Sequence, residues 1–202
     1  MTQHPRPKLV VVTGGPGAGK TALLEVVRHH FCEHVVVLPE AASMLFLGGF
    51  PRHDTRTGRM WSQRAIWHVE RSLEQLAIEE GQAAIVLCDR GTIDGVAYWP
   101  ADATPLPEDM GTTLEAELAR YASVIHLRTP THHNGYNHQN PARRESAREA
   151  ARIDDRILEA WGKHPNRTIV ESTADFMEKV QRAVELIRVE VPECCRLQAP
   201  TL

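Results

Sequence analysis

The chain has 202 residues, of which 42% are hydrophobic and 24% are charged, and its formal net charge is -3. This length suits one domain with a sizeable core, and the composition is unlike that of a disordered or fibrous chain. The slightly negative charge gives no global attraction to nucleic acid, and no apolar run approaches the roughly 20 residues that cross a membrane. We therefore expect a cytoplasmic protein that binds neither nucleic acid nor membrane.

Apolar runs alternate with amphipathic segments along the chain. Five runs are expected to be buried strands, at residues 9–13, 34–38, 83–88, 123–127 and 167–170. Helices are expected at 21–31, 61–80, 107–121, 146–161 and 173–189, with a short helix through 47 and a polar loop at 48–59. This pattern predicts a three-layer α/β fold, in which a five-stranded parallel sheet carries helices on both faces. We expect one domain over 1–191, with a lid at about 130–150 and a frayed tail at 192–202.

The segment after the first predicted strand carries the strongest motif. Residues Gly14–Thr21 match the phosphate-binding pattern G-x-x-x-x-G-K-[ST] in full, between a predicted strand and a predicted helix. With this motif, the predicted three-layer fold is that of a P-loop NTPase. Lys20 is expected to reach the β- and γ-phosphates of ATP or GTP, and the Thr21 hydroxyl is expected to ligate Mg²⁺. The residues expected to wrap the phosphates are Gly14, Gly15, Pro16, Gly17, Ala18 and Gly19. A glycine-rich turn that binds nothing is the alternative.

Acidic residues follow two of the predicted strands, at the sheet edge where ligands collect in open α/β folds. Asp89 ends the third strand in the position of an acid that holds Mg²⁺ through water, and Arg90 follows it directly. Glu40 follows the second strand, where it could accept a proton from an attacking hydroxyl. Two alternatives stay open: Asp89 could cap a helix near Thr92, and Glu40 could be a solvated residue at a helix start.

With these motifs placed, the chain resembles, from about Lys8 to Ile187, a P-loop kinase-like family with an AAA-type ATP-binding domain. This family includes the ribosylnicotinamide kinase domain of NadR and the TRPL translocation defect proteins. More distantly, Pro39-Glu40 and Asp89-Arg90 are similar to the residues that end the second and third strands of deoxynucleoside and thymidylate kinases. The resemblance implies that Glu40 is the base, that Asp89 serves Mg²⁺ and that Arg90 lies near the reacting phosphate.

The fourth predicted strand ends in Leu127-Arg128-Thr129-Pro130, which is similar to the Leu-Arg-x-x-Pro that precedes the lid of deoxynucleoside kinases. The resemblance implies a lid whose arginines clamp the transferring phosphoryl group. We rank Arg144 first as the catalytic contact, with Arg128 and Arg143 as further nucleotide-binding residues. Arg144 and Arg148 are spaced to share a helix face, and a solvated helix with ordinary surface charge is the alternative.

The acceptor of the phosphoryl group is expected between Glu40 and the helix predicted at 61–80. Side chains that suit a base, a sugar or a phosphate are found in that helix and after the third strand: Gln63, Arg64, Trp67, Arg71 and Asp94. A core tryptophan flanked by solvated arginines is the alternative. Eleven histidines show no zinc-binding spacing, and the four cysteines, which also lack it, are expected to be reduced: Cys32, Cys88, Cys194 and Cys195.

Two functions from different classes follow from these patterns. The first is a kinase that uses Mg-ATP, or GTP, to phosphorylate a nucleoside, a nucleotide or a similar small metabolite that bears a hydroxyl group. The second is a nucleotide-dependent switch, or slow NTPase, that acts through a protein partner and changes shape with its nucleotide. The oligomeric state is left open, with a homodimer as one option.

Overall fold

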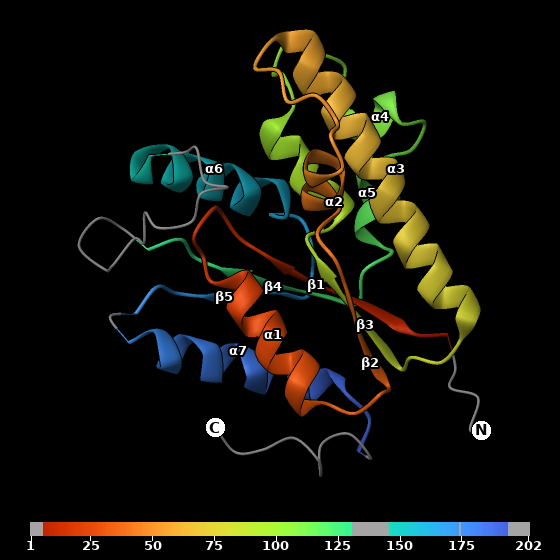
Figure 1. Cartoon of the computed structure of the whole chain (residues 1–202), viewed down its shortest axis with the longest axis vertical. Helices are drawn as coiled ribbons and strands as arrows, with labels where there is room; N and C mark the ends of the chain where they lie inside the picture. Colours follow the sequence, from red (N-terminus) through yellow and green to blue (C-terminus); the bar gives the residue numbers. More distant parts are fainter. Residues whose placement is uncertain (1–5, 131–145, 174, 194–202) are drawn as a thin grey trace.

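The structure is a computed structural model that describes residues 6–130, 146–173 and 175–193 (Figure 1). Five parallel strands form one sheet: β1 Lys8–Thr13, β2 Val35–Leu38, β3 Ile85–Asp89, β4 Ser123–Leu127 and β5 Arg167–Val170. Their order across the sheet is β2-β3-β1-β4-β5. Because β1 is central, the glycine-rich loop that follows it leaves the middle of the sheet, between the ends of β3 and β4.

Side chains of β1 alternate between two cores. Val10 and Val12 pack with α1 Lys20–His30 and α7 Phe176–Glu190 on one face of the sheet. Leu9 and Val11 belong to the core of the other face. The elements that cover this second face are α3 Arg56–Glu80, the 3₁₀ helix η1 Thr92–Tyr98, α5 Leu114–Leu118 and α6 Ala147–Ala160.

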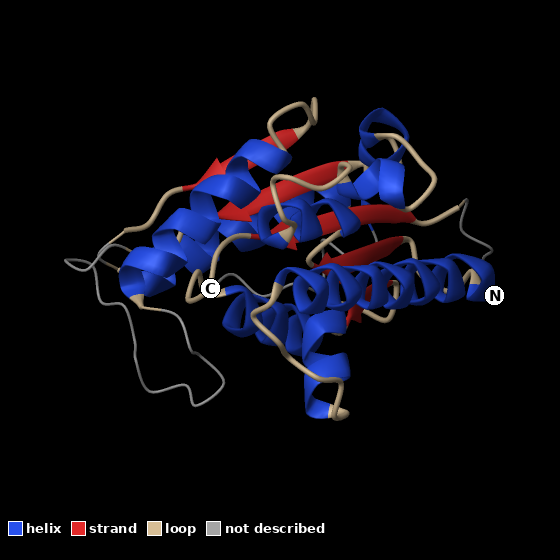
Figure 2. Ribbon diagram, turned by 90° about the horizontal axis from the view of Figure 1, so that it is seen from above, coloured by secondary structure: helices blue, strands red, loops and turns tan. Residues whose placement is uncertain are grey.

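Figure 1 shows these layers: α1 and α7 lie on one side of the sheet, and α3, α5 and α6 lie on the other. Figure 2 shows the strands of the sheet and the surrounding helices from above. Strands buried on both faces have to be apolar at nearly every position, and this explains the continuous apolar runs in the sequence. The predicted three-layer α/β fold is therefore confirmed.

Two helices differ from expectation. The helix predicted at 61–80 begins at Arg56, because the Thr55 side chain accepts a hydrogen bond from the Gly58 N–H at 3.1 Å and caps an earlier turn. The helix predicted at 107–121 is two short ones, α4 Leu106–Asp109 and α5, since Gly111 adopts a φ of 75° between them. Hydrophobic periodicity reports neither a cap nor a break of this kind.

Three further expectations concern the short helix after the second strand, the cysteines and the absence of a membrane-spanning helix. The short helix after the second strand is α2 Ala41–Leu47. Cys88 is a free, buried thiol, as expected. Cys32 is disulfide-bonded, so the expectation of a reduced cysteine is wrong there. The spacing of the cysteines in the sequence does not indicate this bond. Within the described ranges, no helix is both long and apolar enough to span a bilayer.

Candidate functional site

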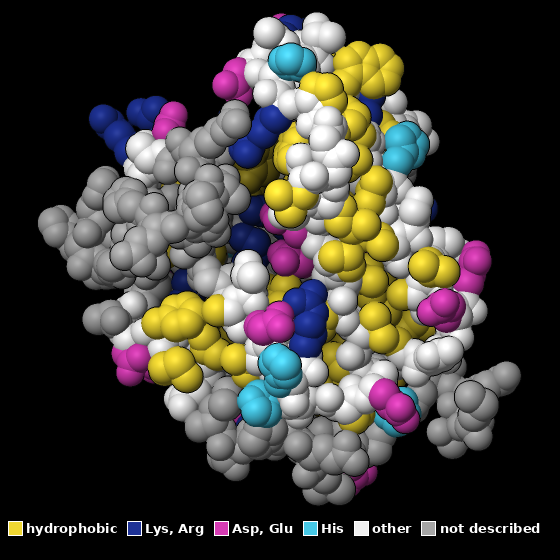
Figure 3. All heavy atoms as spheres, in the orientation of Figure 1, with side chains coloured by type: hydrophobic (Ala, Val, Ile, Leu, Met, Phe, Trp, Pro, Cys, Tyr) yellow, Lys and Arg dark blue, Asp and Glu magenta, His cyan; other side chains and the backbone are white. Residues whose placement is uncertain are grey.

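The loop between β1 and α1 has a backbone that only glycine adopts readily. Gly14, Gly17 and Gly19 have φ values of 136°, 80° and 96°. A Cβ at Gly14 would overlap the carbonyl oxygen of Leu127, at the end of β4. The loop ends where α1 begins at Lys20, so the N–H groups of the first helical turn face the loop and form an anion site. Figure 3, in the orientation of Figure 1, shows basic and acidic side chains together in a recess of the surface. Hydrophobic side chains lie beside this recess, over α2 and α3.

Lys20 is held against its own loop. Its side-chain Nζ donates to the carbonyl oxygens of Gly14 at 2.8 Å and Gly15 at 3.2 Å, and the residue is only 8% exposed. Burial, and then the nearby Arg90 guanidinium, lower the pKa of Lys20 to about 8. Thr21, the next residue, is exposed. The loop therefore holds a cation and a hydroxyl where the motif requires them.

Asp89 ends β3 beside Val12 of β1. Its Oδ1 atom is buried and has no hydrogen-bond partner among the described residues. Burial raises the pKa of Asp89, and Lys20 opposes that rise. The cap of η1 is Gly91, so the alternative of Asp89 as a helix cap is wrong.

A buried carboxylate oxygen without a partner is costly unless a ligand uses it. Asp89 and the exposed Thr21 hydroxyl are hard oxygen ligands, and they fit a Mg²⁺ ion that takes its other ligands from water and phosphate. Within the described ranges, no group of three or more His, Cys, Asp or Glu side chains could hold a metal by itself. These two residues thus suit a metal that arrives with a phosphorylated ligand.

Arg90 links the ends of β2 and β3 to the loop. Its side chain donates from Nε to Glu40 Oε1 at 2.8 Å and from Nη1 to the Gly14 carbonyl at 3.3 Å. Its backbone has a φ of 74°, and no other described residue apart from glycines has a positive φ. Its N–H bonds to the Val12 carbonyl at 3.1 Å. Strain of this kind costs about 1–3 kcal/mol and is typical of functional sites.

Glu40 is an ionised partner of Arg90. Burial raises its pKa, but the charge of Arg90 and a 2.5 Å hydrogen bond from the Ser43 hydroxyl outweigh burial and lower the pKa to about 2. A carboxylate with this pKa is a weak proton acceptor at neutral pH. The geometry therefore suits Glu40 to orienting a hydroxyl by hydrogen bonding. Glu40 does stand at a helix start, as the N-cap residue of α2. It is not freely solvated, because it is ion-paired with Arg90.

Asp94 is a structural residue. Its side chain is 2% exposed and accepts bonds from the Thr13 hydroxyl, from Arg90 Nη1 at 3.2 Å, from the Gly91 N–H at 3.1 Å and from Trp161 Nε1 at 3.0 Å. A carboxylate with four donors has no capacity left for a ligand. The expectation that Asp94 lines the acceptor pocket is wrong, and its role is to fix Arg90.

The residues predicted on α3 also have structural partners. Trp67 is buried in a separate apolar cluster. Arg64 makes two 2.7 Å bonds to Asp109 of α4, and Arg71 pairs with Glu117 of α5 at 3.4 Å. The alternative of a core tryptophan is confirmed, but the arginines are paired with acids of neighbouring helices.

Sequence reasoning missed a buried acid behind the loop. Asp154 of α6 is 1% exposed and accepts hydrogen bonds from the N–H groups of Gly15 at 2.8 Å and Thr129 at 3.1 Å. Its Oδ1 also lies 2.9 Å from His126 Nε2. The bonds from His126 and from the two N–H groups outweigh burial and lower the pKa of Asp154. The available signal was an acid on the apolar face of a helix, next to Ile153.

A buried lysine holds the other end of the loop. Lys179 of α7 donates to the carbonyl oxygens of Ala18 at 2.7 Å and Arg128 at 2.5 Å. Burial lowers its pKa to about 8. Asp154 and Lys179 together form what we call the loop clamp, because Asp154 binds a loop N–H group, that of Gly15, and Lys179 binds a loop carbonyl, that of Ala18. Each also binds one backbone group just after β4. The loop clamp ties α6 and α7 to the phosphate site.

The predicted lid arginines are only partly described. Arg128 pairs with Asp154 at 3.0 Å and with Asp155 at 2.8 Å, so its guanidinium contacts α6 in this structure. Arg148 lies exposed on α6. Arg143 and Arg144 lie outside the described residues.

Comparisons with known proteins agree with the fold. A family model described as an AAA domain matches residues 9–179. The thymidylate kinase from Ehrlichia chaffeensis is similar in structure, with a TM-score of 0.58 and 12% sequence identity over 91% of this chain and 100% of that chain. At this identity the likeness concerns the fold alone. A search of the curated proteins finds no match.

We predict that nucleotide affinity weakens as the pH rises from 7 to 9. Lys20 attracts phosphate only as an ammonium ion, and with a pKa of about 8 it loses its proton across this interval. The protonated fraction falls from about nine-tenths to about one-tenth, so the Kd for Mg-ATP should rise by up to about tenfold. Calorimetric titrations at pH 7, 8 and 9 measure this. Lys179→Met, which removes the other lysine of similar pKa, should keep the dependence, and a Kd that stays constant in the wild type would contradict this role of Lys20.

We predict that Asp154→Asn weakens both the fold and nucleotide binding. The amide presents an N–H group toward one of the two backbone donors, and leaving such a donor unpaired costs about 1–3 kcal/mol. The neighbouring exposed acid gives a matched control, because Asp155→Asn removes only a surface ion pair worth about 0–1 kcal/mol. Urea unfolding and ATP titration of both variants measure the difference. Equal effects of the two substitutions would show that Asp154 does not hold the loop.

Proposed function

The chain belongs to the AAA-domain family, and on that premise we propose that it is a kinase that uses Mg-ATP to phosphorylate a nucleoside, a nucleotide or a similar small metabolite. The observation that carries the proposal is the meeting of three groups at one edge of the sheet: the P-loop lysine, the unpartnered oxygen of Asp89, and the Glu40–Arg90 pair. GTP is a further candidate donor. The similarity of Pro39-Glu40 and Asp89-Arg90 to the strand ends of deoxynucleoside and thymidylate kinases supports the proposal.

The loop and the first turn of α1 would bind the phosphates of the donor. Backbone N–H groups and the helix N-terminus supply positive potential there, and Lys20 would exchange the carbonyls of Gly14 and Gly15 for phosphate oxygens. Thr21 and Asp89 would hold Mg²⁺, which when bound neutralises charge on the phosphates. Asp154 and Lys179 keep the loop in shape while Lys20 changes partners.

Arg90 and Glu40 would have different roles on the acceptor side of the site. Arg90 reaches the loop carbonyl of Gly14, so its positive charge lies at the rim of the phosphate site. Glu40 would orient the attacking hydroxyl by accepting its hydrogen bond. Phosphoryl transfer depends chiefly on positioning and charge neutralisation, so a carboxylate of low pKa suffices. Arg144, which precedes α6, is our candidate for a lid arginine that contacts the transferring group.

A second candidate function is a nucleotide-dependent switch or slow NTPase that acts through a protein partner. The observation that favours it is the pairing of Glu40 with Arg90 and Ser43, which engages both oxygens of the proposed orienting group within the protein itself. A switch tolerates loss of Glu40, whereas a kinase needs this carboxylate beside its acceptor. The same variant therefore separates the two functions.

The test is phosphoryl transfer from Mg-ATP and Mg-GTP to nucleosides, nucleoside monophosphates and nicotinamide riboside. We expect product that depends on the acceptor, with a loss of about 10²–10³-fold in kcat for Lys20→Ala, since a charge is removed from the reacting phosphates. Glu40→Gln should lose about 10–100-fold, the loss expected when an attacking group is poorly positioned. Glu25→Gln, an exposed acid on α1, should match the wild type. Nucleotide binding without transfer to any acceptor would reject the kinase in favour of the switch.

A further inference from the structure

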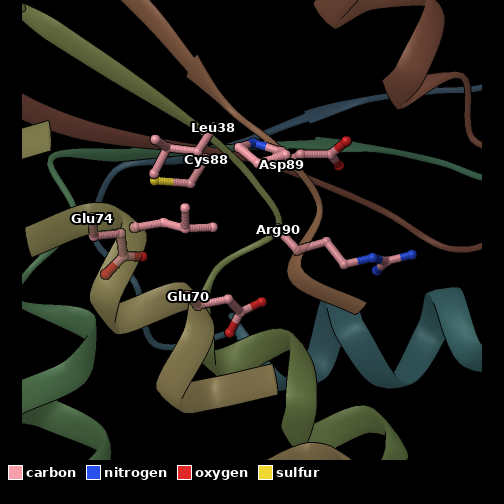
Figure 4. Close-up of a pocket in the computed structure, with 8 residues that line it drawn as sticks. Leu38, Glu70, Glu74, Cys88, Asp89 and Arg90 are labelled. Atoms are coloured by element: carbon pink, nitrogen blue, oxygen red, sulfur yellow. The ribbon is translucent and has the colours of Figure 1, made fainter. Parts of the chain in front are cut away.

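A small pocket lies between α3 and the ends of β2 and β3 (Figure 4). Eight residues line it: Leu38, Pro39, Glu70, Leu73, Glu74, Cys88, Asp89 and Arg90. Its cavity volume is about 10 Å³. That is about the room that one water molecule needs, so the pocket admits a single hydroxyl group of a ligand and not the whole ligand. Because Asp89 and Arg90 belong to the candidate site, the pocket adjoins the place where the acceptor should react.

Glu70 is a buried carboxyl without a partner in this pocket. It is 7% exposed, and no hydrogen bond or ion pair within the described residues involves its carboxyl group. Burial, and then the carboxylates of Asp94 and Glu74, raise the pKa of Glu70 well above its usual range. Figure 4 shows its carboxyl group directed from α3 toward the side of the pocket where Arg90 lies.

Glu74, one helical turn further along α3, is a contrasting case. Its carboxylate accepts a 2.8 Å hydrogen bond from the Tyr121 hydroxyl and pairs with the guanidinium of Arg120. Glu74 is thus a structural acid whose burial is compensated. Glu70 has no such protein partner, and its carboxyl oxygens are not completely enclosed, so they open into the pocket. A largely desolvated polar group without a protein partner lowers the stability of a fold. Such a cost is common where a group serves a ligand.

We propose that Glu70 determines acceptor specificity by hydrogen bonding to a hydroxyl group of the acceptor, an inference that rests on the proposed kinase function. A carboxylate accepts from a hydroxyl and a neutral carboxyl can also donate to one, so a hydroxyl satisfies Glu70 in either protonation state. The acceptor then carries at least two hydroxyls, one that attacks phosphorus and one that Glu70 holds, as a ribose ring does.

The charges around the pocket argue against a phosphate as its occupant. Glu70, Glu74 and Asp89 line it with a single guanidinium, that of Arg90, which is already paired with Glu40. An anion would therefore meet unfavourable potential there, whereas the neutral hydroxyls of a sugar would not. The ring of a nucleoside, or of the nucleoside part of a nucleotide, fits this chemistry.

The kinetic test compares ribonucleosides with their 2′,3′-dideoxy analogues, which keep the attacking 5′-hydroxyl but lack the others. A protein group that bonds a substrate hydroxyl discriminates strongly against an analogue without it. The wild type should prefer the ribonucleoside by more than about tenfold in kcat/KM, and Glu70→Leu should lose that preference through a raised KM for the ribonucleoside. Glu70→Gln should keep part of the preference, and Glu74→Gln, the matched control, should keep all of it. The Kd for Mg-ATP should be the same in all four proteins.

The melting temperature Tm, measured without nucleotide or acceptor, separates a binding role of Glu70 from a structural one. Loss of a structural residue lowers Tm, whereas loss of a carboxyl that serves a ligand should raise it. Glu70→Leu should raise Tm by about 2–4 °C, the shift that corresponds to about 1 kcal/mol in a chain of this size, and Glu74→Gln should lower Tm. A fall of Tm in Glu70→Leu, or a wild-type preference that survives in it, would overturn this inference alone. A wild type that binds Mg-ATP and phosphorylates no acceptor would overturn the proposed function and this assignment with it.

Discussion

The candidate site depends on one constraint, the close approach of the loop backbone at Gly14 to the carbonyl of Leu127 at the end of β4. The neighbouring strands and the positive φ of Gly14 fix the start of the loop, and the loop clamp then fixes its course. Asp154 accepts a hydrogen bond from the Gly15 N–H and Lys179 donates one to the Ala18 carbonyl, so two helices on opposite faces of the sheet hold the same loop. The packing of α6 and α7 on the sheet is thereby linked to the shape of the phosphate site.

The cations at the sheet edge bond to a carboxylate or to backbone carbonyls. Lys20, which is buried, bonds to loop carbonyls, and Arg90, which is half-buried, bonds to Glu40. Two carboxyl groups stand apart from this arrangement. The Oδ1 atom of Asp89 and the carboxyl of Glu70 have no hydrogen-bond partner among the described residues. They line the same pocket, one nearer the predicted metal and one on the acceptor side, so we assign each of them a role in binding a ligand.

The strands and the phosphate loop could be predicted from the sequence because both are encoded locally, by apolar runs and by glycines at fixed spacing. The helix start at Arg56 and the break at Gly111 could not, since a cap and a left-handed residue leave no trace in hydrophobic periodicity. Hydrogen bonds between residues that are far apart in the sequence were harder to predict. Asp94 was expected at the acceptor, but its bond from Trp161 crosses 67 residues, and Asp154 reaches Gly15 across 139. The sequence does not distinguish Glu70 from the other acids of its long amphipathic helix, because its burial depends on the packing of that helix against the sheet.

The central claim is that this edge of the sheet binds a nucleotide together with Mg²⁺. The most direct measurement is calorimetric titration of the full chain with a non-hydrolysable ATP analogue, once with Mg²⁺ and once with EDTA, for the wild type and Asp89→Asn. The account predicts binding that Mg²⁺ tightens by about tenfold or more in the wild type, about 1.4 kcal/mol, and by much less in Asp89→Asn. No binding, or equal dependence on Mg²⁺ in the two proteins, would contradict it.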